Sequence, residues 1–329
     1  MKFLTVPAFA KINLDLRIVG TLPDGYHDLR TILQSLALCD RVTLVRRRGP
    51  LTMTCDDPTV PADRTNLVWK AALLLHRAGA GRRTVPRDVE IQLCKRIPAR
   101  AGLGGGSADA AATLLALNAW WSLGLDMASL SRIGAALGAD VPFFLVGGTA
   151  LGLGRGDDIY PLEDLPTVHV VIVRPGFGVS TPDAYQWFDR DTRRPQKPGV
   201  TKRPAPGWPA WSASLRNDLE APVTLHHPTI GRIRQSLLDA GAAMAAMSGS
   251  GSAVFGLFER ADAARRTARD LARPGWLSVA TRTLNRRAYA RRMATGVGMA
   301  GAQGTSSAPA ERRQRSHDSV ARRPQGRIR

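Results

Sequence analysis

The chain of 329 residues is short of several residue types, and each shortage excludes a class of protein. It has 3 cysteines, Cys39, Cys55 and Cys94, with no CxxC pair among them. A disulfide-stabilised secreted fold and a cysteine zinc site are therefore not predicted, and a reducing cytoplasm is the expected location. No run of eighteen apolar residues is present, so no membrane-spanning helix is expected. The first residues alternate with charges, unlike a signal peptide.

Acidic residues are also scarce. The 27 Asp and Glu stand against 46 Lys and Arg, which gives a formal net charge of +19. Clustered Lys and Arg bind phosphate backbones, so a basic nucleic-acid-binding protein is an alternative from another class. The excess is spread out, however, and residues 286–329 hold eleven arginines against two acids. That end is rich in Gly, Ser, Ala and Pro, so we predict a basic, disordered tail over 291–329 and no nucleic-acid partner.

The remainder has the patterning of a folded α+β protein. The 44% hydrophobic content of the whole chain is ordinary, and its length allows two cores. Strands and helices are mixed rather than strictly alternating, and the pattern then restarts, so we expect domains over 1–160 and 161–290. Within the first, residues 141–154 are expected to form buried strands around a glycine corner. A Pro-, Arg- and Trp-rich stretch over 189–211 is predicted to be a surface loop or insertion.

A glycine cluster over residues 102–106 lies between a predicted strand (88–98) and a predicted helix (107–121). Glycines let the backbone approach a ligand closely, and the N–H groups of a helix's first turn attract anions. The cluster is therefore a candidate phosphate site, and no GxxxxGK[ST] motif is present to make it a P-loop. The same spacing also suits a plain strand–helix connection. Ser107 would either cap the helix, which we favour, or ligate magnesium.

Four stretches in this order resemble the GHMP kinase superfamily: "PAFAKINLDLRIVGTLPDGYHDL", "PARAGLGGGSADAA", "LGADVPFFL" and "MSGSGSAVF". The similarity covers roughly residues 5–285, and the combination is far more specific than any one motif. The resemblance implies an N-terminal domain like ribosomal protein S5 domain 2 and a ferredoxin-like C-terminal domain. It is strongest to the branch that phosphorylates the 2-hydroxyl of 4-diphosphocytidyl-2-C-methyl-D-erythritol in the non-mevalonate (MEP) isoprenoid pathway. A homoserine- or mevalonate-type acceptor is the alternative.

The resemblance also implies roles for individual residues. Asp140 would act as the base, and Lys11 would be its cationic partner. Without the resemblance, Lys11 would be a solvated strand lysine and Asp140 a helix cap. Mg²⁺ is expected with ATP, but no residue can be assigned to the ion. The implied ATP-binding loop comprises Pro98, Ala99, Arg100, Ala101, Gly102, Leu103, Gly104, Gly105, Gly106, Ser107 and Ala108. Arg100 and Ala101 stand where relatives often have glycine or small residues, and Arg100 would either add a phosphate contact or only line the rim of the site.

An aromatic acceptor site is implied as well. Tyr26 and His27 match the positions that hold the cytosine ring, and Tyr185 matches a second aromatic on its other face. Two aromatic faces suit a flat base, because stacking contributes ~1–3 kcal/mol per base. As plain residues, Tyr26 and His27 would simply belong to a turn. The small-molecule substrate is the only partner expected of a monomer or homodimer.

Further acceptor contacts follow from the same comparison. The alternation of the first strand places Asn13 on the same face as Lys11, and Asn13 is therefore a substrate-binding candidate. Thr181 and the pair Asn217–Asp218 would lie near the substrate. The second glycine-rich stretch, residues 249–252, would face the phosphates or form a plain hairpin turn.

Overall fold

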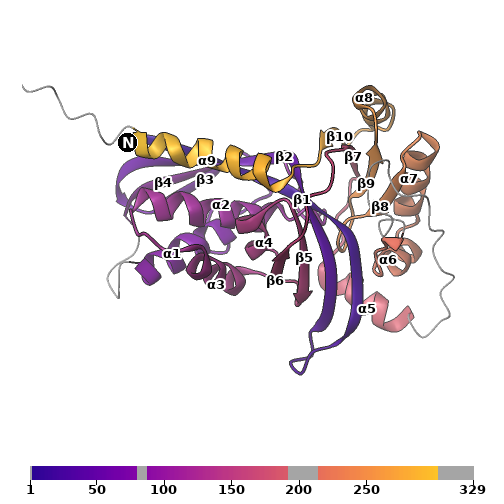
Figure 1. The fold of residues 1–329 in the computed structure, drawn as a ribbon, viewed down its shortest axis with the longest axis horizontal. Helices are drawn as coiled ribbons and strands as arrows, with labels where there is room; N and C mark the ends of the chain where they lie inside the picture. Colours follow the sequence, from indigo (N-terminus) through magenta and orange to yellow (C-terminus); the bar gives the residue numbers. More distant parts are fainter. Residues whose placement is uncertain (1, 80–86, 192–213, 303–329) are drawn as a thin grey trace, which may run out of the picture.

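The structure is a computed structural model, and it describes residues 2–79, 87–191 and 214–302. Two antiparallel-rich sheets stand beside each other, each with its own helices (Figure 1). The predicted mixture of strands and helices is thus what the chain forms. No helix in these ranges is both long and apolar enough to cross a membrane.

The first sheet has the order β3-β4-β2-β5-β6, with β1 paired to β2, and only β3 and β4 run parallel. Helices α1–α4 pack on it, and their apolar side chains share one core with the sheet. The strands are β1 (Phe3–Thr21), β2 (His27–Pro50), β3 (Thr52–Cys55), β4 (Arg87–Cys94), β5 (Thr149–Gly154) and β6 (Asp158–Pro161). The helices are α1 (Leu67–Gly79), α2 (Gly105–Trp120), α3 (Met127–Leu137) and α4 (Val141–Val146).

The second sheet has the order β10-β7-β9-β8 and is antiparallel throughout. It comprises β7 (His169–Arg174), β8 (Met244–Met247), β9 (Val254–Phe258) and β10 (Leu277–Arg282). Its helices are α5 (Thr181–Asp191), α6 (Glu220–His226), α7 (Pro228–Asp239) and α8 (Ala261–Asp270). The chain then returns to the first sheet as α9 (Arg286–Ala302), which runs along β1 (Figure 1).

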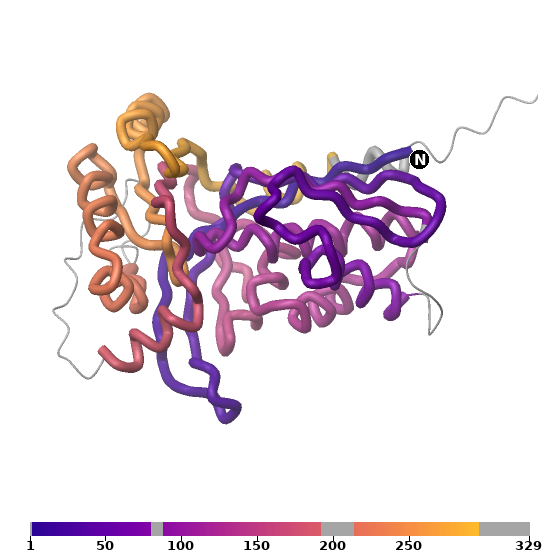
Figure 2. Tube along the Cα trace, turned by 180° about the vertical axis from the view of Figure 1, so that it is seen from behind, coloured from indigo at the N-terminus to yellow at the C-terminus, as the bar shows by residue number. Residues whose placement is uncertain are grey.

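The long hairpin of β1 and β2 joins the two halves. Its distal end extends past the first sheet's helices and reaches α5 (Figures 1 and 2). Ile12 and Leu14 of β1 belong to a core that also contains Ile172 and Phe255 of the second sheet. The opposite, polar face of β1 is buried too, because loops cover it. The strand was expected to be half-buried, and it is instead enclosed on both faces around Lys11.

Two local expectations are corrected. Residues 141–146 form helix α4 and not a strand, and only 149–154 are extended. Pro142 lies in the first turn, where a missing N–H costs nothing, and Gly147 ends the helix with φ 68°. An apolar run this short has no clear period, which is why the sequence pattern misassigned it.

The residue at which the disordered tail was predicted to begin is also wrong. Helix α9 continues to Ala302, whereas disorder was expected from residue 291. Tyr289 and Met293 are buried against the first sheet, and this packing compensates for the poor apolar content of the segment. Residues 192–213 and 303–329 lie outside the described residues. They include all but the first three residues of the predicted 189–211 insertion and most of the predicted tail.

A buried hydrogen bond gives a test of how α9 is held. The Tyr289 hydroxyl donates to the Phe144 carbonyl at 2.5 Å. Tyr289→Phe should lower the free energy of unfolding by about 1–2 kcal/mol, because it leaves a buried acceptor without this donor. Urea denaturation measures the change. Tyr160→Phe is the control, since that hydroxyl bonds Asp158 at the surface, and equal losses in both variants would contradict the assignment.

Candidate active site

The polar face of β1 forms the centre of the site. The Lys11 ammonium donates to Asn13 Oδ1 at 2.5 Å and lies 3.4 Å from Asp140 Oδ2. The Lys11 side chain is 4% exposed and that of Asp140 is 37% exposed. Asp140 precedes α4 but makes no capping bond with its side chain, so the carboxylate is directed to the lysine. A buried ammonium requires such partners, and the two residues predicted to act together are in contact.

The glycine loop wraps around the same lysine. The Lys11 amide donates to the Leu103 carbonyl at 3.0 Å. Gly104 has φ +71°, and a Cβ there would lie 2.6 Å from Phe144 Cζ and 3.1 Å from Lys11 Cγ. Only glycine therefore fits between the lysine and α4.

Helix α2 begins at Gly105, with Gly104 as its N-cap and no side-chain cap. Its first backbone hydrogen bond is from Ala108 N to Gly104 O at 2.8 Å. The N–H groups of Gly105, Gly106 and Ser107 therefore have no helical acceptor and can bind an anion. Ser107 was expected to be the cap, and it instead lies inside the first turn.

A second glycine loop, residues 248–252 between β8 and β9, closes over the first. Ser248 Oγ donates to the Gly102 carbonyl at 2.9 Å and accepts from the backbone N–H of Asn13 at 3.2 Å. Gly249 lies so close to the lysine that a Cβ there would be 3.4 Å from Lys11 Nζ. The two glycine-rich motifs, which lie far apart in the sequence, thus form one surface beside Lys11.

A third loop, residues 216–218, bonds both to β1 and to the second sheet. From the sequence, Asn217 and Asp218 were expected only to lie near the substrate. Asn217 Nδ2 donates to the carbonyls of Met247 at 2.9 Å and Gly249 at 2.7 Å. Asp218 Oδ2 accepts from the Ile18 amide at 3.0 Å. Asp15 Oδ1 accepts from the Arg216 amide at 2.9 Å, and burial raises the pKa of Asp15. These side chains satisfy backbone groups and so fix the shape of the neighbouring loop.

The hairpin end and α5 provide the aromatic side of the site. The His27 and Tyr185 rings stack with centroids 4.7 Å apart and planes at 24°. His27 Nε2 lies 2.8 Å from Asp189 Oδ1, and Thr181 Oγ1 lies 3.0 Å from Ser250 Oγ. Burial raises the pKa of Tyr185, and the charge of Asp140 raises it further. The tyrosine hydroxyl therefore stays neutral, and its ring lies on the side of Asp140.

Tyr26 takes a different position from its predicted partner. Its side chain is exposed at the end of the hairpin, and the Arg155 guanidinium lies 4.4 Å from its ring centroid. Arg155 also pairs with Asp24. The described ring contact of Tyr26 is therefore with an arginine, while His27 is the residue that meets Tyr185. No sequence motif around Arg155 indicated its contact with Tyr26.

A buried charge cluster below the glycine loop escaped sequence reasoning. Lys95 Nζ lies 2.5 Å from Asp40 Oδ2 and 2.6 Å from Asp109 Oδ2. Asp40 Oδ1 also accepts from the Ile97 amide at 2.7 Å. Burial raises the pKa of Asp109 to about 8, despite the opposing attraction of Lys95. The cluster joins the first turns of α2 to the interior of β2 and to the end of β4, and no local pattern joins three such distant positions.

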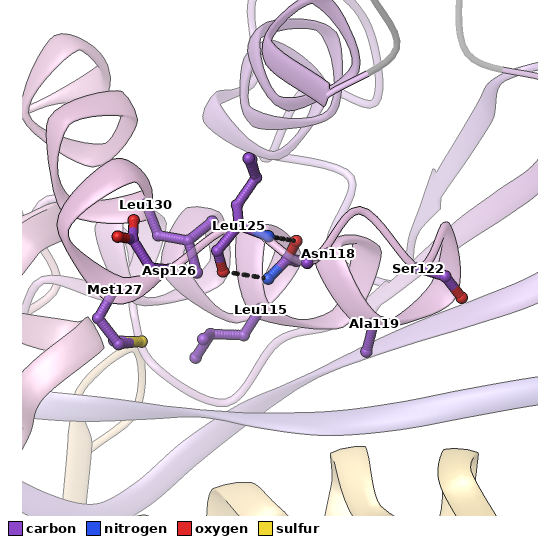
Figure 3. Close-up of a pocket in the computed structure, with 9 residues that line it drawn as sticks. Leu115, Asn118, Ala119, Ser122, Leu125, Asp126, Met127 and Leu130 are labelled. Atoms are coloured by element: carbon purple, nitrogen blue, oxygen red, sulfur yellow. Dashed lines mark hydrogen bonds between the residues drawn. The ribbon is translucent and has the colours of Figure 1, made fainter.

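Neither the metal-ligating side chains nor the surface hollow of the described chain indicates a second site. The described residues contain no group of three His, Cys, Asp or Glu side chains that could hold a metal. A hollow of about 540 Å³ lies between the end of α2 and the start of α3 (Figure 3). Of its polar side chains, Asn118 is satisfied by both backbone groups of Leu125, at 2.9 and 3.1 Å, and Asp126 accepts from the Ser129 amide at 2.8 Å. None of the predicted site residues lines this hollow.

Comparison with known proteins agrees with this arrangement. Residues 66–148 match the GHMP kinases N-terminal domain, and residues 208–275 match the GHMP kinases C-terminal family. A protein of Moorella thermoacetica named 4-diphosphocytidyl-2-C-methyl-D-erythritol kinase is 44% identical over 296 residues, covering 86% of this chain and 100% of the relative. This chain belongs to that family of GHMP kinases.

Other members of the kinase family support the assignment. A Synechococcus sp. (strain JA-3-3Ab) protein of the same name is 46% identical over 80% of this chain and 89% of its own length. A crystal structure of 4-(cytidine 5'-diphospho)-2C-methyl-D-erythritol kinase superposes with a TM-score of 0.70 at 36% identity, covering 85% of this chain and 99% of that one. The two-domain GHMP kinase fold predicted from the sequence is confirmed, while the domain boundary at residue 160 stays a prediction.

Gly102 offers a steric test of the joined loops in this kinase. A Cβ at Gly102, where φ is +74°, would lie 2.0 Å from the Ser248 carbonyl oxygen. Gly102→Ala should therefore lower the free energy of unfolding by more than about 2 kcal/mol. Gly106→Ala is the matched control, since the nearest atom to its Cβ is 3.8 Å away, and alanine should stabilise the helix by up to about 1 kcal/mol. Chemical denaturation that ranked the two variants in the other order would disprove the contact.

The buried cluster predicts a pH dependence of stability. The pKa of Asp109 is raised from 3.8 to about 8, so the folded chain keeps a proton that the unfolded chain releases. Its stabilising contribution is complete below about pH 4 and is lost as the pH rises to about 8. Asp109→Asn should flatten this fall, so that thermal unfolding at pH 5 and pH 8 differs less than in the native chain. Asp126→Asn, at an exposed helix cap, should leave the fall intact; an equal pH slope in Asp109→Asn would contradict the pKa shift.

Proposed function

We propose that this kinase transfers the γ-phosphate of ATP to the 2-hydroxyl of 4-diphosphocytidyl-2-C-methyl-D-erythritol, in the non-mevalonate route to isoprenoid precursors. The observation that carries the proposal is the Lys11–Asp140 pair, 3.4 Å apart, with the glycine loop beside Lys11 and the Tyr185 ring on the side of Asp140. The names of the relatives at 44% and 46% identity support the acceptor.

ATP is proposed to bind at residues 98–108. The free N–H groups of the first turn of α2 would hold its phosphates, and the helix dipole adds positive potential there. Mg²⁺ would neutralise phosphate charge when bound with the nucleotide, and it usually keeps several waters and few protein ligands. The absence of a three-residue ligand cluster in the described chain is compatible with such binding, and no step below depends on a protein ligand to the ion.

In the proposed reaction Asp140 accepts the proton of the acceptor hydroxyl. The hydroxyl oxygen forms a bond to the γ-phosphorus, and the bond between that phosphorus and the β–γ bridging oxygen breaks to release ADP. Lys11 is the cationic partner of Asp140 and lies where it can offset negative charge at the transferred group. Because Asn13 binds the same ammonium, it fixes where the lysine points.

The acceptor's base would lie at the His27–Tyr185 stack. Tyr185 offers a neutral hydroxyl and a ring, and Asp189 orients the His27 imidazole. Tyr26 and Thr181 are proposed as further contacts, Tyr26 from the hairpin end and Thr181 from the start of α5. A small acid such as homoserine or mevalonate would need no such aromatic pair.

The direct test is turnover. Purified protein with ATP and Mg²⁺ should release ADP when given the cytidylyl methylerythritol acceptor, and not when given homoserine or mevalonate. Turnover of homoserine or mevalonate alone would assign a different GHMP kinase activity. Salt-sensitive nucleic-acid binding without any turnover would support the alternative from the other class.

The base assignment has its own test. Asp140→Asn should lower kcat by about 10²–10⁴-fold, because it removes the proton acceptor, with little change in either KM. Steady-state kinetics measure both constants, and circular dichroism verifies that the fold is kept. Asp270→Asn, at an exposed position of α8, is the control. Unchanged kcat in Asp140→Asn would remove Asp140 from the chemistry.

A further inference from the structure

Arg100 is the one charged residue between Pro98 and Gly106, and its backbone is unusual. It adopts φ +53°, in the left-handed region that disfavours any residue with a side chain. Its side chain is exposed, and within the described residues its guanidinium has neither a hydrogen bond nor an ion pair. A strained position that keeps an unpaired guanidinium is expected where the charge has a use.

The position of Arg100 is fixed by contacts on both sides. A Cβ on Gly178 would lie 2.9 Å from Arg100 Cβ and 3.0 Å from its carbonyl oxygen. Gly178 lies three residues before Thr181, the first residue of α5. On the other side, the Ala101 carbonyl accepts from the Ala253 amide at 3.1 Å. Arg100 therefore lies where the ATP loop meets the segment leading into the acceptor helix.

The charges near the loop leave a deficit that Arg100 can fill. Lys11 is engaged by Asn13 and Asp140, and Lys95 is enclosed by Asp40 and Asp109. Neither lysine brings an uncompensated charge, although both proposed substrates carry phosphates. A guanidinium is the side chain best suited to a phosphate, because it can donate two parallel hydrogen bonds.

We propose that Arg100 binds phosphate at the boundary of the two substrate sites, and that this phosphate is the diphosphate of the nucleotide acceptor. The contact with Gly178 favours the acceptor over ATP, because it places Arg100 Cβ against the segment that leads to Thr181 and Tyr185. The inference rests on the proposed function for the identity of the acceptor. It departs from the ATP-binding role that the resemblance implies for Arg100, because it assigns the guanidinium to the diphosphate of the acceptor.

The decisive variant is Arg100→Gly, since glycine suits the observed backbone. If Arg100 were only structural, this change would be neutral or beneficial in every assay. We expect a melting temperature about 2 °C higher, together with weaker binding of the diphosphate. Calorimetric titration with CDP and with cytidine, with ADP saturating the donor site, measures the contribution of the diphosphate as the ratio of the two affinities. That ratio should fall about ten- to a hundredfold in Arg100→Gly, while cytidine affinity stays constant.

Two further variants sharpen the result. Arg100→Lys should keep part of the ratio, because it retains the charge but loses the planar fork. Arg96→Ala, an exposed arginine just before the loop, should leave the ratio unchanged. An unchanged ratio in Arg100→Gly, a wild-type chain that does not prefer CDP to cytidine, or a loss confined to ADP affinity would each overturn the proposal. Failure of the proposed function is separate, because it would appear as absent wild-type turnover whatever the binding ratio.

Discussion

The burial of one lysine ammonium constrains most of the site. Lys11 is almost fully enclosed, and a charged group without partners in such a place would be far too costly to keep. Asn13 and Asp140 therefore have to reach it, which fixes the start of α4 relative to β1. The room around the lysine is equally restricted. A Cβ at Gly104 would press on Phe144 and on Lys11 Cγ, and a Cβ at Gly249 would press on Asn13 Oδ1, the acceptor of the lysine ammonium. The proposed catalytic pair and the two glycine loops are consequences of the same constraint.

The two halves of the kinase form one site because β1 bonds to loops from both of them. Its amides bond to the Leu103 carbonyl and to Ser248 Oγ, and Asp15 takes the Arg216 amide. The apolar face of the same strand is packed against the second sheet, so the strand cannot shift without exposing that core. The two glycine loops are therefore held in fixed positions beside the same strand. Pre-organisation of this kind is where positioning contributes most to catalysis.

The sequence predicted the parts of the site that depend on short-range patterns. The glycine cluster before a helix and the alternation that puts Lys11 and Asn13 on one face of a strand were visible in the sequence, whereas the pairing of Lys11 with Asp140 was expected only from the resemblance. Patterns of this kind could not predict contacts among distant residues. Lys95, Asp40 and Asp109 come from three elements, and Arg155 meets Tyr26 through the pairing of β5 with β2. The residues 141–146 were misassigned because an apolar run of that length carries no period. Burial on both faces of β1 was also missed, since alternation alone does not reveal what covers a polar face.

The two buried lysines also determine how the glycine loop can bind phosphate. Each is neutralised by aspartate, so neither adds net charge at the N-terminus of α2. The attraction there comes from directed N–H groups and the helix dipole, which act over short distances and hold a phosphate only in the correct geometry. An unpaired lysine at the same place would add an attraction that extends to any anion whatever its geometry. With both lysines compensated, the proposed phosphate contact at the first turn of α2 depends on short-range, directed hydrogen bonds, and within the described chain the unpaired charge beside the loop is that of Arg100.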